Sequence, residues 1–305
     1  MDLINICICT YKRNDLLSQC LNSLTRLQLS DDMHVHVTVI DNASDGHAET
    51  VIKFFEKKFS FPLHYHQEPR RGIPFVRNRA IDETIKLQST FLVFIDDDEW
   101  VEPDWLMNLY VFCKGHGGSV VVSGRVISDL PSDVSSDIRG LFNKKSRSTG
   151  SWLKSCATDN VIIPVEIFKD QSLRFDVSRP LAGGTDTMFF CCVFEKGVPI
   201  IKCAEAVVHE IIPSNRLSLK WMCRRKYRSG ITVAWRKKRS GRLPIVIAFS
   251  ALTNIGFSAI KAAVFAAFKK NLRRNKCLLA VCRSSGILSG VMGKETDSYE
   301  NTDGQ

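Results

Sequence analysis

Three consecutive carboxylates end an apolar segment in the first half of the chain. Residues 91–95 read Phe-Leu-Val-Phe-Ile, which predicts a short buried strand, and Asp96, Asp97 and Asp98 follow it directly. A strand that ends in carboxylates places oxygen ligands at the rim of a sheet, where α/β folds bind their ligands. Carboxylates at alternate positions suit Mg2+ or Mn2+, which prefer oxygen and often share a phosphate ligand. The alternative interpretation is a solvated acidic turn.

Polar residues follow two other predicted strands. Residues 9–13 (Cys-Thr-Tyr-Lys-Arg) come after the first strand, and residues 41–44 (Asp-Asn-Ala-Ser) come after the second. A helix that begins near Pro74 adds Arg77 close to its start, and arginine pairs with phosphate as a fork. Because the carboxyl ends of parallel strands converge on one rim, we expect these groups to meet. Each segment alone is equally compatible with a plain turn or a solvated helix face.

Strands and helices alternate through the first 130 residues. The predicted strands are residues 3–9, 35–40, 63–66, 91–95 and 120–127. The predicted helices are residues 16–27, 48–59, 74–87 and 103–113. This alternation predicts an α/β fold with a doubly wound, largely parallel sheet. The glycine-rich dinucleotide fingerprint and the P-loop are both missing from the sequence.

Taken together, these segments resemble the inverting family 2 glycosyltransferases, which have the GT-A fold. The matching segments, in matching order, are residues 8–13, 39–44, 72–78 and 94–98. A further block, from Thr158-Asp159-Asn160 to Gly183-Gly184-Thr185-Asp186, is similar to the acceptor half of succinoglycan-type exopolysaccharide glycosyltransferases. The resemblance covers residues 4–230 and implies a mixed, mostly parallel GT-A sheet.

The resemblance implies a role for each matching residue in the donor half. Thr10, Tyr11 and Arg13 would line the nucleotide pocket. Asp41 would accept hydrogen bonds from the base, and Arg77 would lie near the nucleotide.

The carboxylates complete the implied machinery. Asp96 and Asp98 match the DxD motif that positions Mn2+ or Mg2+ on the donor diphosphate, and Asp97, between them, is grouped with the nucleotide-binding residues. Asp186 matches the general base. The chemistry agrees, because a divalent cation neutralises the departing diphosphate and a carboxylate takes the proton of the attacking hydroxyl. One base and direct attack predict inversion at the anomeric carbon.

Two further features concern the predicted site. The family usually has Glu-Asp where this chain has Thr185-Asp186, so acceptor contacts or the proton affinity of the base are expected to differ. His209 is a candidate metal ligand, although a lone histidine is more often structural. Asp186 by itself also suits a helix N-cap.

Charge is distributed unevenly along the chain. The net charge is +10, but residues 1–213 contain 23 Lys+Arg against 28 Asp+Glu, whereas residues 214–305 contain 19 against 4. No acidic residue occurs between Ser214 and Lys294. Such a stretch predicts an anionic partner, either nucleic acid or a membrane surface.

The interior of this basic stretch favours a membrane. Residues 243–268 are almost wholly apolar, and basic clusters flank them at residues 236–239 and 269–274. This pattern favours anionic lipid as the partner over nucleic acid, and we expect no nucleic-acid partner. Because both flanks are positive, we prefer an in-plane helix or a re-entrant hairpin near residues 254–256 to a simple span. A buried pair of core helices is the alternative. Residues 277–293 form a second apolar stretch alongside.

These patterns predict three regions. Residues 1–213 form a GT-A domain with a nucleotide-sugar half (1–130) and an acceptor half (131–213), residues 214–294 form a membrane-associating helical region, and residues 295–305 form a disordered tail. The eleven cysteines show no paired CxxC spacing, and the first strand begins at Leu3 without a signal peptide. We therefore expect the globular part on the cytoplasmic face of the inner or plasma membrane.

The expected function is metal-dependent transfer of a sugar from a nucleotide-diphosphate donor to a saccharide acceptor. The basic, apolar C-terminal region favours a lipid-linked acceptor. The expected context is cell-surface or exopolysaccharide synthesis. Two alternatives remain: a non-catalytic membrane-bound saccharide or nucleotide binder, and a sugar nucleotidyltransferase. The latter predicts a glycine-rich triphosphate loop, which residues 10–14 do not provide.

Overall fold

The computed structural model describes residues 1–143, 146–170, 172–181 and 183–294, so the predicted polar tail lies outside the described residues. The chain divides into two compact units. The sheet unit comprises residues 1–127, 146–180 and 185–211. The helical unit comprises residues 128–145, 181–184 and 212–305.

A mixed β-sheet forms the centre of the sheet unit. Its strands are β1 (Asp2–Thr10), β2 (Met33–Asp41), β3 (Leu63–Gln67), β4 (Phe91–Asp96), β5 (Glu99–Val101), β6 (Val121–Asp129), β7 (Trp152–Leu153), β8 (Asn160–Pro164) and β9 (Ile200–Ile211). In the described part of the chain they are ordered β3-β2-β1-β4-β8-β6-β9-β5, with β7 paired to β9. Strands β1 to β4 pair in parallel, and the antiparallel pairs involve β5 and later strands. The predicted mixed, mostly parallel sheet is confirmed.

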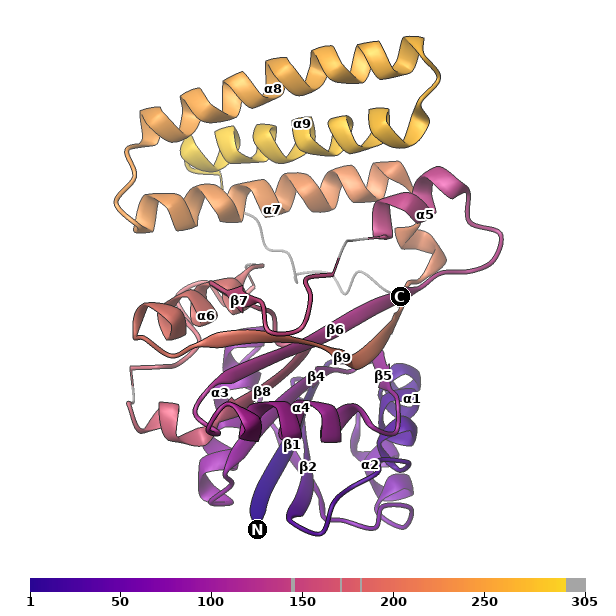
Figure 1. Ribbon diagram of the computed structural model, residues 1–305, viewed down its shortest axis with the longest axis vertical. Coiled ribbons are helices and arrows are strands. Elements are labelled where there is room, and N and C mark those ends of the chain that lie inside the picture. The colour runs from indigo at the N-terminus through magenta and orange to yellow at the C-terminus, as the bar shows by residue number, and fades with distance from the viewer. Residues whose placement is uncertain (144–145, 171, 182, 295–305) are drawn as a thin grey trace. The chain divides into compact units, whose positions relative to one another are not determined.

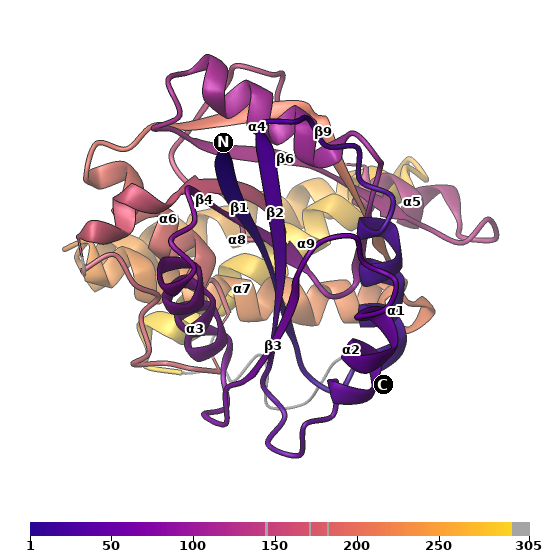
Figure 2. The ribbon, with the colours of Figure 1, turned by 90° about the horizontal axis from the view of Figure 1, so that it is seen from below.

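Helices cover both faces of this sheet. One face packs against α1 (Asn14–Leu24), α2 (Glu49–Phe55) and α4 (Trp105–Gly115), and the other packs against α3 (Ile73–Lys86) and α6 (Thr185–Glu195). Figure 2 shows α3 on one side of β1 and β2 and α1 and α2 on the other. The alternation of strand side chains explains this, because Ile4, Ile6 and Ile8 face one layer whereas Cys7 faces the other.

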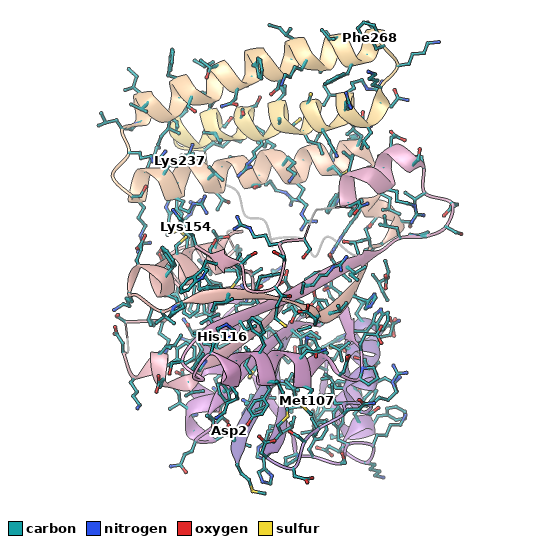
Figure 3. The ribbon with its side chains drawn as sticks, in the orientation of Figure 1. Asp2, Met107, His116, Lys154, Lys237 and Phe268 are labelled. Carbon is teal, nitrogen blue, oxygen red and sulfur yellow. The ribbon has the colours of Figure 1, made fainter. Side chains whose placement is uncertain are left out.

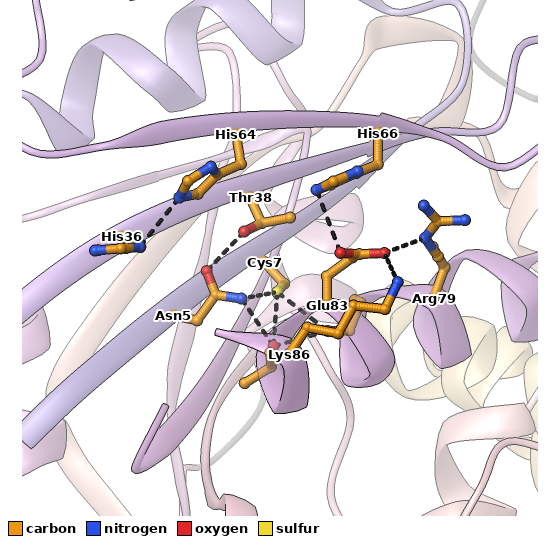
Figure 4. Close-up of polar contacts among 11 residues, drawn as sticks. Asn5, Cys7, His36, Thr38, His64, His66, Arg79, Glu83 and Lys86 are labelled. Atoms are coloured by element: carbon orange, nitrogen blue, oxygen red, sulfur yellow. Dashed lines mark hydrogen bonds and ion pairs between the residues drawn. The ribbon is translucent and has the colours of Figure 1, made fainter. Parts of the chain in front are cut away.

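A buried polar network fixes α3 against the sheet. The Asn5 side chain donates to Thr84 Oγ1 on α3 (2.8 Å), and Thr38 Oγ1 donates to Asn5 Oδ1 (2.8 Å), as Figure 4 shows. All three side chains are buried, so each hydrogen bond satisfies a group that would otherwise be costly to bury. Arg77 lies on the same helix, and its position is therefore tied to β1 and β2.

The helical unit contains α5 (Ser136–Phe142), α7 (Leu219–Arg239), α8 (Pro244–Ala267) and α9 (Asn271–Val291). Helix α9 packs between α7 and α8, as Figure 1 shows. The backbones of α7 and α9 approach closely, because a Cβ at Gly230 would clash with the Arg283 carbonyl and a Cβ at Gly286 would clash with the Tyr227 carbonyl. Glycine at these two positions allows the close packing.

Helix α8 corrects one prediction. It is continuous from Pro244 to Ala267, so a re-entrant hairpin near residues 254–256 is wrong. The polar side chains there are satisfied within the helix, because Asn254 Nδ2 and Thr253 Oγ1 both donate to the Ser250 carbonyl. Because these side chains find their hydrogen-bond partner within the helix, the helix continues through residues 254–256 without a chain reversal.

The outer face of α8 is apolar and exposed. Its large exposed side chains include Ile245, Phe249, Phe257 and Ile260, and the alternative of a buried core pair is therefore wrong for this face. Figure 3 labels Phe268, just after α8, and Lys237, near the end of α7. Within the described residues, α8 is the one helix that is long and apolar enough to cross a membrane by length and composition.

Candidate active site

The ends of β1, β2 and β4 lie at one rim of the sheet. In the parallel register Thr10 pairs with Asp41, and Cys9 pairs with Asp96. The predicted convergence of the three polar segments follows from this register, because the parallel strands end at the same level.

Asp97 connects the turn after β4 to the loop after β1. Its buried carboxylate accepts hydrogen bonds from Thr10 Oγ1 (2.8 Å) and from Arg13 Nη1 (3.2 Å). Burial raises the pKa of Asp97 to about 6, although the positive charge of Arg13 opposes the rise. Both carboxylate oxygens accept hydrogen bonds from this chain, so Asp97 holds the loop after β1 against the turn after β4. Its predicted grouping with the nucleotide-binding residues stays a prediction.

Asp96 and Asp98 lie on either side of Asp97 and are both half-buried. Asp98 Oδ2 is 3.5 Å from Arg13 Nη1. Burial raises the pKa of Asp96 well above its usual range, Arg77 opposes this, and the charges of Asp98 and Asp186 add to it. The charge of the predicted base therefore acts on a predicted metal ligand, Asp96.

Glu99 has a structural role that the sequence did not reveal. Its Oε2 accepts a hydrogen bond from the backbone N–H of Asp96 (2.9 Å), which closes the acidic turn. Burial raises the pKa of Glu99 well above its usual range, and the nearby charge of Asp96 raises it further. In the sequence, the only indication of a role for Glu99 was its position directly after three aspartates. That position did not distinguish a residue that closes the turn from a metal ligand.

Asp41 is fully buried and shapes the loop after β2. Its carboxylate accepts hydrogen bonds from the backbone N–H groups of Ala43 (2.8 Å) and Ala48 (2.9 Å) and from Tyr65 Oη (2.9 Å). A carboxylate has about four acceptor positions, so three of them are used within the chain. The predicted contact of Asp41 with a base stays a prediction.

Asn42 fastens a second loop to the same strand end. Its Nδ2 donates to the carbonyls of Glu68 and Arg70, and its Oδ1 accepts from the Gly72 N–H, each over 2.8 Å. These three bonds hold residues 68–72 next to the end of β2. Helix α3 begins directly after these residues. Arg71, on this loop, has its guanidinium carbon 5.2 Å from the centroid of the Tyr11 ring.

Tyr11, directly after β1, has a half-buried side chain. Lys12 Nζ is 5.9 Å from the ring centroid, and Lys12 has a φ of +53°. A left-handed conformation at a non-glycine residue is costly and often occurs at functional sites. The ring and the cations around it offer a flat, positively charged surface that suits a nucleotide.

Arg77 contacts the predicted base directly. Its buried guanidinium forms an ion pair with Asp186 Oδ1 and donates to Thr185 Oγ1 (3.3 Å). Thr185 Oγ1 in turn donates to Asp186 Oδ1 (3.1 Å), and Thr158 Oγ1 donates to Asp186 Oδ2 (3.3 Å). The structure thus brings Arg77 and Asp186 together, although they are 109 residues apart in the sequence.

His209 lies on β9, next to the edge strand β5. Its ring stacks on Trp100 with centroids 3.9 Å apart and planes 11° apart, and its Nε2 is 3.3 Å from Glu102 Oε1. Trp100 and His209 are paired residues of β5 and β9. The suggestion that His209 binds a metal stays a prediction.

The acidic turn suits a divalent cation that takes part of its coordination from a substrate. In the part of the chain that the structure describes, no group of three or more His, Cys, Asp or Glu side chains is arranged to hold a metal ion. Two hard oxygen donors, Asp96 and Asp98, nevertheless fit Mg2+ or Mn2+, which commonly bind through one or two carboxylates and substrate phosphates. The residues therefore fit a cation that arrives with its donor.

Comparison with known proteins agrees with this geometry. The sequence profile of the family described as "Glycosyl transferase family 2" matches residues 5–171. The chain is 30% identical to the succinoglycan biosynthesis protein ExoM of Rhizobium meliloti over 316 residues, which cover 97% of this chain and 95% of ExoM.

Solved structures show the same fold at low sequence identity. Residues 1–349 of S. aureus TarS in complex with UDP-GlcNAc align with a TM-score of 0.56 at 15% identity, over 96% of this chain and 93% of that one. A mannosyltransferase of Pyrobaculum calidifontis in complex with GDP-Man and Mn2+ aligns with a TM-score of 0.58 at 16% identity, over 96% and 76% of the two chains. The chain spans 38% of the longer TarS chain. At these identities the likeness concerns the fold alone.

Proposed function

The chain belongs to glycosyl transferase family 2, and from that membership we propose that it moves a sugar from a nucleotide-diphosphate donor to a saccharide acceptor with inversion at the anomeric carbon. One observation carries the proposal. Arg77 forms an ion pair with Asp186, and the charges of both groups act on the carboxyl of Asp96. This arrangement supports a base that works next to a donor-binding acidic turn.

The donor would bind at the rim formed by β1, β2 and β4. Mg2+ or Mn2+, held by Asp96 and Asp98, would neutralise charge on the departing diphosphate. Thr10, Tyr11 and Arg13 border the same pocket, and Asp97 keeps the two loops together. The binding of nucleotide sugars and Mn2+ by structurally similar proteins supports this assignment.

Asp186 would remove the proton of the acceptor hydroxyl. The acceptor O–H bond breaks toward the carboxylate, the acceptor oxygen bonds to the anomeric carbon, and the bond to the diphosphate breaks with its electron pair. A carboxylate base within hydrogen-bond reach contributes roughly 10²–10⁴-fold to such a step. Attack from the side opposite the leaving group inverts the anomeric carbon.

The acceptor would be a lipid-linked saccharide, in exopolysaccharide or other cell-surface synthesis. The similarity to ExoM over nearly the full length of both chains supports this context. The exposed apolar face of α8 and the basic residues at both of its ends support association with an anionic membrane, which we place at the cytoplasmic face of the inner or plasma membrane.

Helix α8 would lie in the membrane plane instead of crossing it. Its neighbour α9 carries Arg283 near its middle and Arg273, Arg274 and Lys276 near its start. Because α9 packs along α8, a crossing α8 would carry these charges to bilayer depth. One Lys or Arg at the bilayer centre costs about 2.5–3.5 kcal/mol even on insertion scales. An in-plane α8 buries its apolar face and leaves α9 outside the hydrocarbon.

The depth of α8 is measurable with tryptophans placed along its outer face. Ile245→Trp, Phe257→Trp and Phe268→Trp replace exposed side chains near its start, its middle and just after its end. Quenching by lipids brominated at known depths is expected to place all three at one shallow level. A crossing helix would instead place residue 257 deep, with the other two shallow and on opposite sides.

A nucleotide panel tests the activity. Thermal unfolding of the full chain is measured with Mn2+ and UDP-, GDP- or dTDP-sugars, and a donor that binds the folded state raises the Tm. Asp186→Asn is expected to keep this shift but to lose sugar transfer or donor hydrolysis by roughly 10³-fold. Asp31→Asn, in an exposed turn, is the control. Unchanged turnover in Asp186→Asn would leave a binding protein as the better explanation.

A further inference from the structure

We infer that Thr158 and Thr185 are positioning residues that orient the Asp186 carboxylate for proton removal. The inference rests on the proposed function, because it takes Asp186 to be the base. The two threonines reach the carboxylate from different segments. Thr158 precedes β8, and Thr185 begins α6.

Each oxygen of Asp186 has its own hydroxyl donor. Thr158 Oγ1 donates to Oδ2 over 3.3 Å, and Thr185 Oγ1 donates to Oδ1 over 3.1 Å. Two donors on opposite oxygens fix the rotation of the carboxylate plane, which a single donor leaves free. Hydrogen bonds at catalytic groups are often long without substrate and shorten in the reacting complex.

Thr158 is held rigidly enough to serve this purpose. Its residue is 1% exposed, and Asn160, two residues later, is tied to three other segments. Asn160 Oδ1 accepts from Trp105 Nε1 (2.9 Å), and Asn160 Nδ2 donates to the carbonyls of Arg125 (3.0 Å) and Ala206 (2.9 Å). A donor on a backbone anchored in this way holds its partner with little freedom.

Thr185 connects the base to Arg77. Its hydroxyl accepts from Arg77 Nη1 (3.3 Å) and donates its own proton to Asp186, so the three groups are ordered together. A threonine hydroxyl carries no negative charge, so Thr185 orders the base without competing with it for the charge of Arg77.

Matched substitutions separate the effect of each threonine hydroxyl from the effect of side-chain volume. Thr158→Val and Thr185→Val remove the hydroxyl at nearly constant size, whereas Thr158→Ser and Thr185→Ser retain it. Thr25→Val is the control, because the Thr25 hydroxyl donates to the Asn22 carbonyl (2.8 Å) at the end of α1 and contacts none of the described site residues. The full chain is used throughout.

The kinetic readout is release of UDP from UDP-glucose and UDP-GlcNAc, and of GDP from GDP-mannose, with Mn2+ and water as acceptor. Each valine variant is expected to lower kcat roughly tenfold with KM unchanged, and each serine variant to stay within about twofold of wild type. Thr25→Val is expected to leave kcat and KM unchanged.

A second readout does not depend on turnover. Crystal structures of the full chain with Mn2+ and UDP are expected to show the Asp186 carboxylate rotated in Thr158→Val and unchanged in Thr158→Ser. Valine variants with wild-type kcat and an unrotated carboxylate overturn the inference. The proposed function fails in a different way, with no nucleotide bound by wild type and no effect of Asp186→Asn.

Discussion

The two units of this protein handle charge in opposite ways. In the sheet unit, acidic side chains gather at one rim and are met by cations of the same unit, as Arg13 meets Asp97 and Arg77 meets Asp186. In the helical unit, α7, α8 and α9 contain no acidic residue, so their lysines and arginines have no carboxylate partner within these helices. Internal compensation suits a site that binds a small charged substrate. A set of helices whose charged side chains are all positive suits an additional anion, such as a lipid headgroup.

The difference extends to how each unit is held together. The sheet unit buries two continuous apolar clusters on either side of its strands. The helical unit has a small buried cluster around Ala234, Ile247 and Ile287, and its close α7–α9 packing depends on glycine. An exposed apolar face remains on α8.

Of the changes that compare the two units, removing one carboxylate of the acidic turn is expected to have the largest effect. Asp98→Asn deletes a charge that a divalent cation would need, while Arg13 keeps Asp97 as a partner. We expect kcat/KM for the donor to fall roughly a hundredfold, because a metal-binding carboxylate contributes several kcal/mol to charge neutralisation. Titration with Mn2+ at fixed donor measures the change. Asp45→Asn, an exposed acid near the same rim, is the control, and equal losses in both variants would contradict the assignment.

The packing of the helical unit is tested by a methyl group. Gly286→Ala forces a Cβ against the Tyr227 carbonyl and is expected to lower the free energy of unfolding by about 1–3 kcal/mol. Gly256→Ala, on α8, has open space around the new Cβ and is expected to be neutral or to stabilise the helix by up to about 1 kcal/mol. Urea unfolding followed by circular dichroism compares the two. Similar destabilisation by both changes would argue against close α7–α9 packing.

A smaller effect is expected from the outer face of α8. Phe249→Ser removes an exposed apolar side chain and is expected to weaken binding to vesicles of phosphatidylglycerol and phosphatidylcholine about tenfold. Phe54→Ser removes a similarly exposed phenylalanine from the sheet unit and serves as the matched control. Co-sedimentation with vesicles gives the partition coefficient. An equal loss from both variants would mean that the two units do not differ in this respect.

The smallest expected effect is the pH dependence of the sheet unit. Burial lowers the pKa of His36, and the neighbouring His64 lowers it further. The folded state then binds the proton less readily than the unfolded chain does, so the contribution to stability is complete above the unfolded pKa of about 6.5 and is lost as the pH falls below it. Urea midpoints at pH 7.5 and 5.5 are expected to differ less in His36→Gln than in wild type. His116→Gln, on an exposed residue, is expected to leave the difference unchanged.

The sequence by itself determined the parallel strands of the sheet and the acidic turn, because both are local patterns. Apolar runs of strand length, followed by Asp41 or by Asp96 to Asp98, specify a strand and its polar end without reference to distant residues. The charge asymmetry and the apolar run of α8 are likewise visible from composition alone. The absence of a break near Asn254 was not predictable, since the back-bonding to Ser250 that keeps the helix intact is a feature of its folded geometry.

Only the tertiary structure decided which side chains meet. Arg77 and Asp186, and Thr158 beside them, come from α3, α6 and the segment before β8, and their contacts depend on how these elements pack on one sheet. The same packing gives the carboxylates of Asp41 and Asp97 partners within the chain, namely backbone N–H groups for Asp41 and Thr10 for Asp97, and their predicted contacts with a ligand stay predictions. A motif specifies which chemical groups are available. Their partners are set by burial and by contacts between residues far apart in the chain, and local sequence does not encode those contacts.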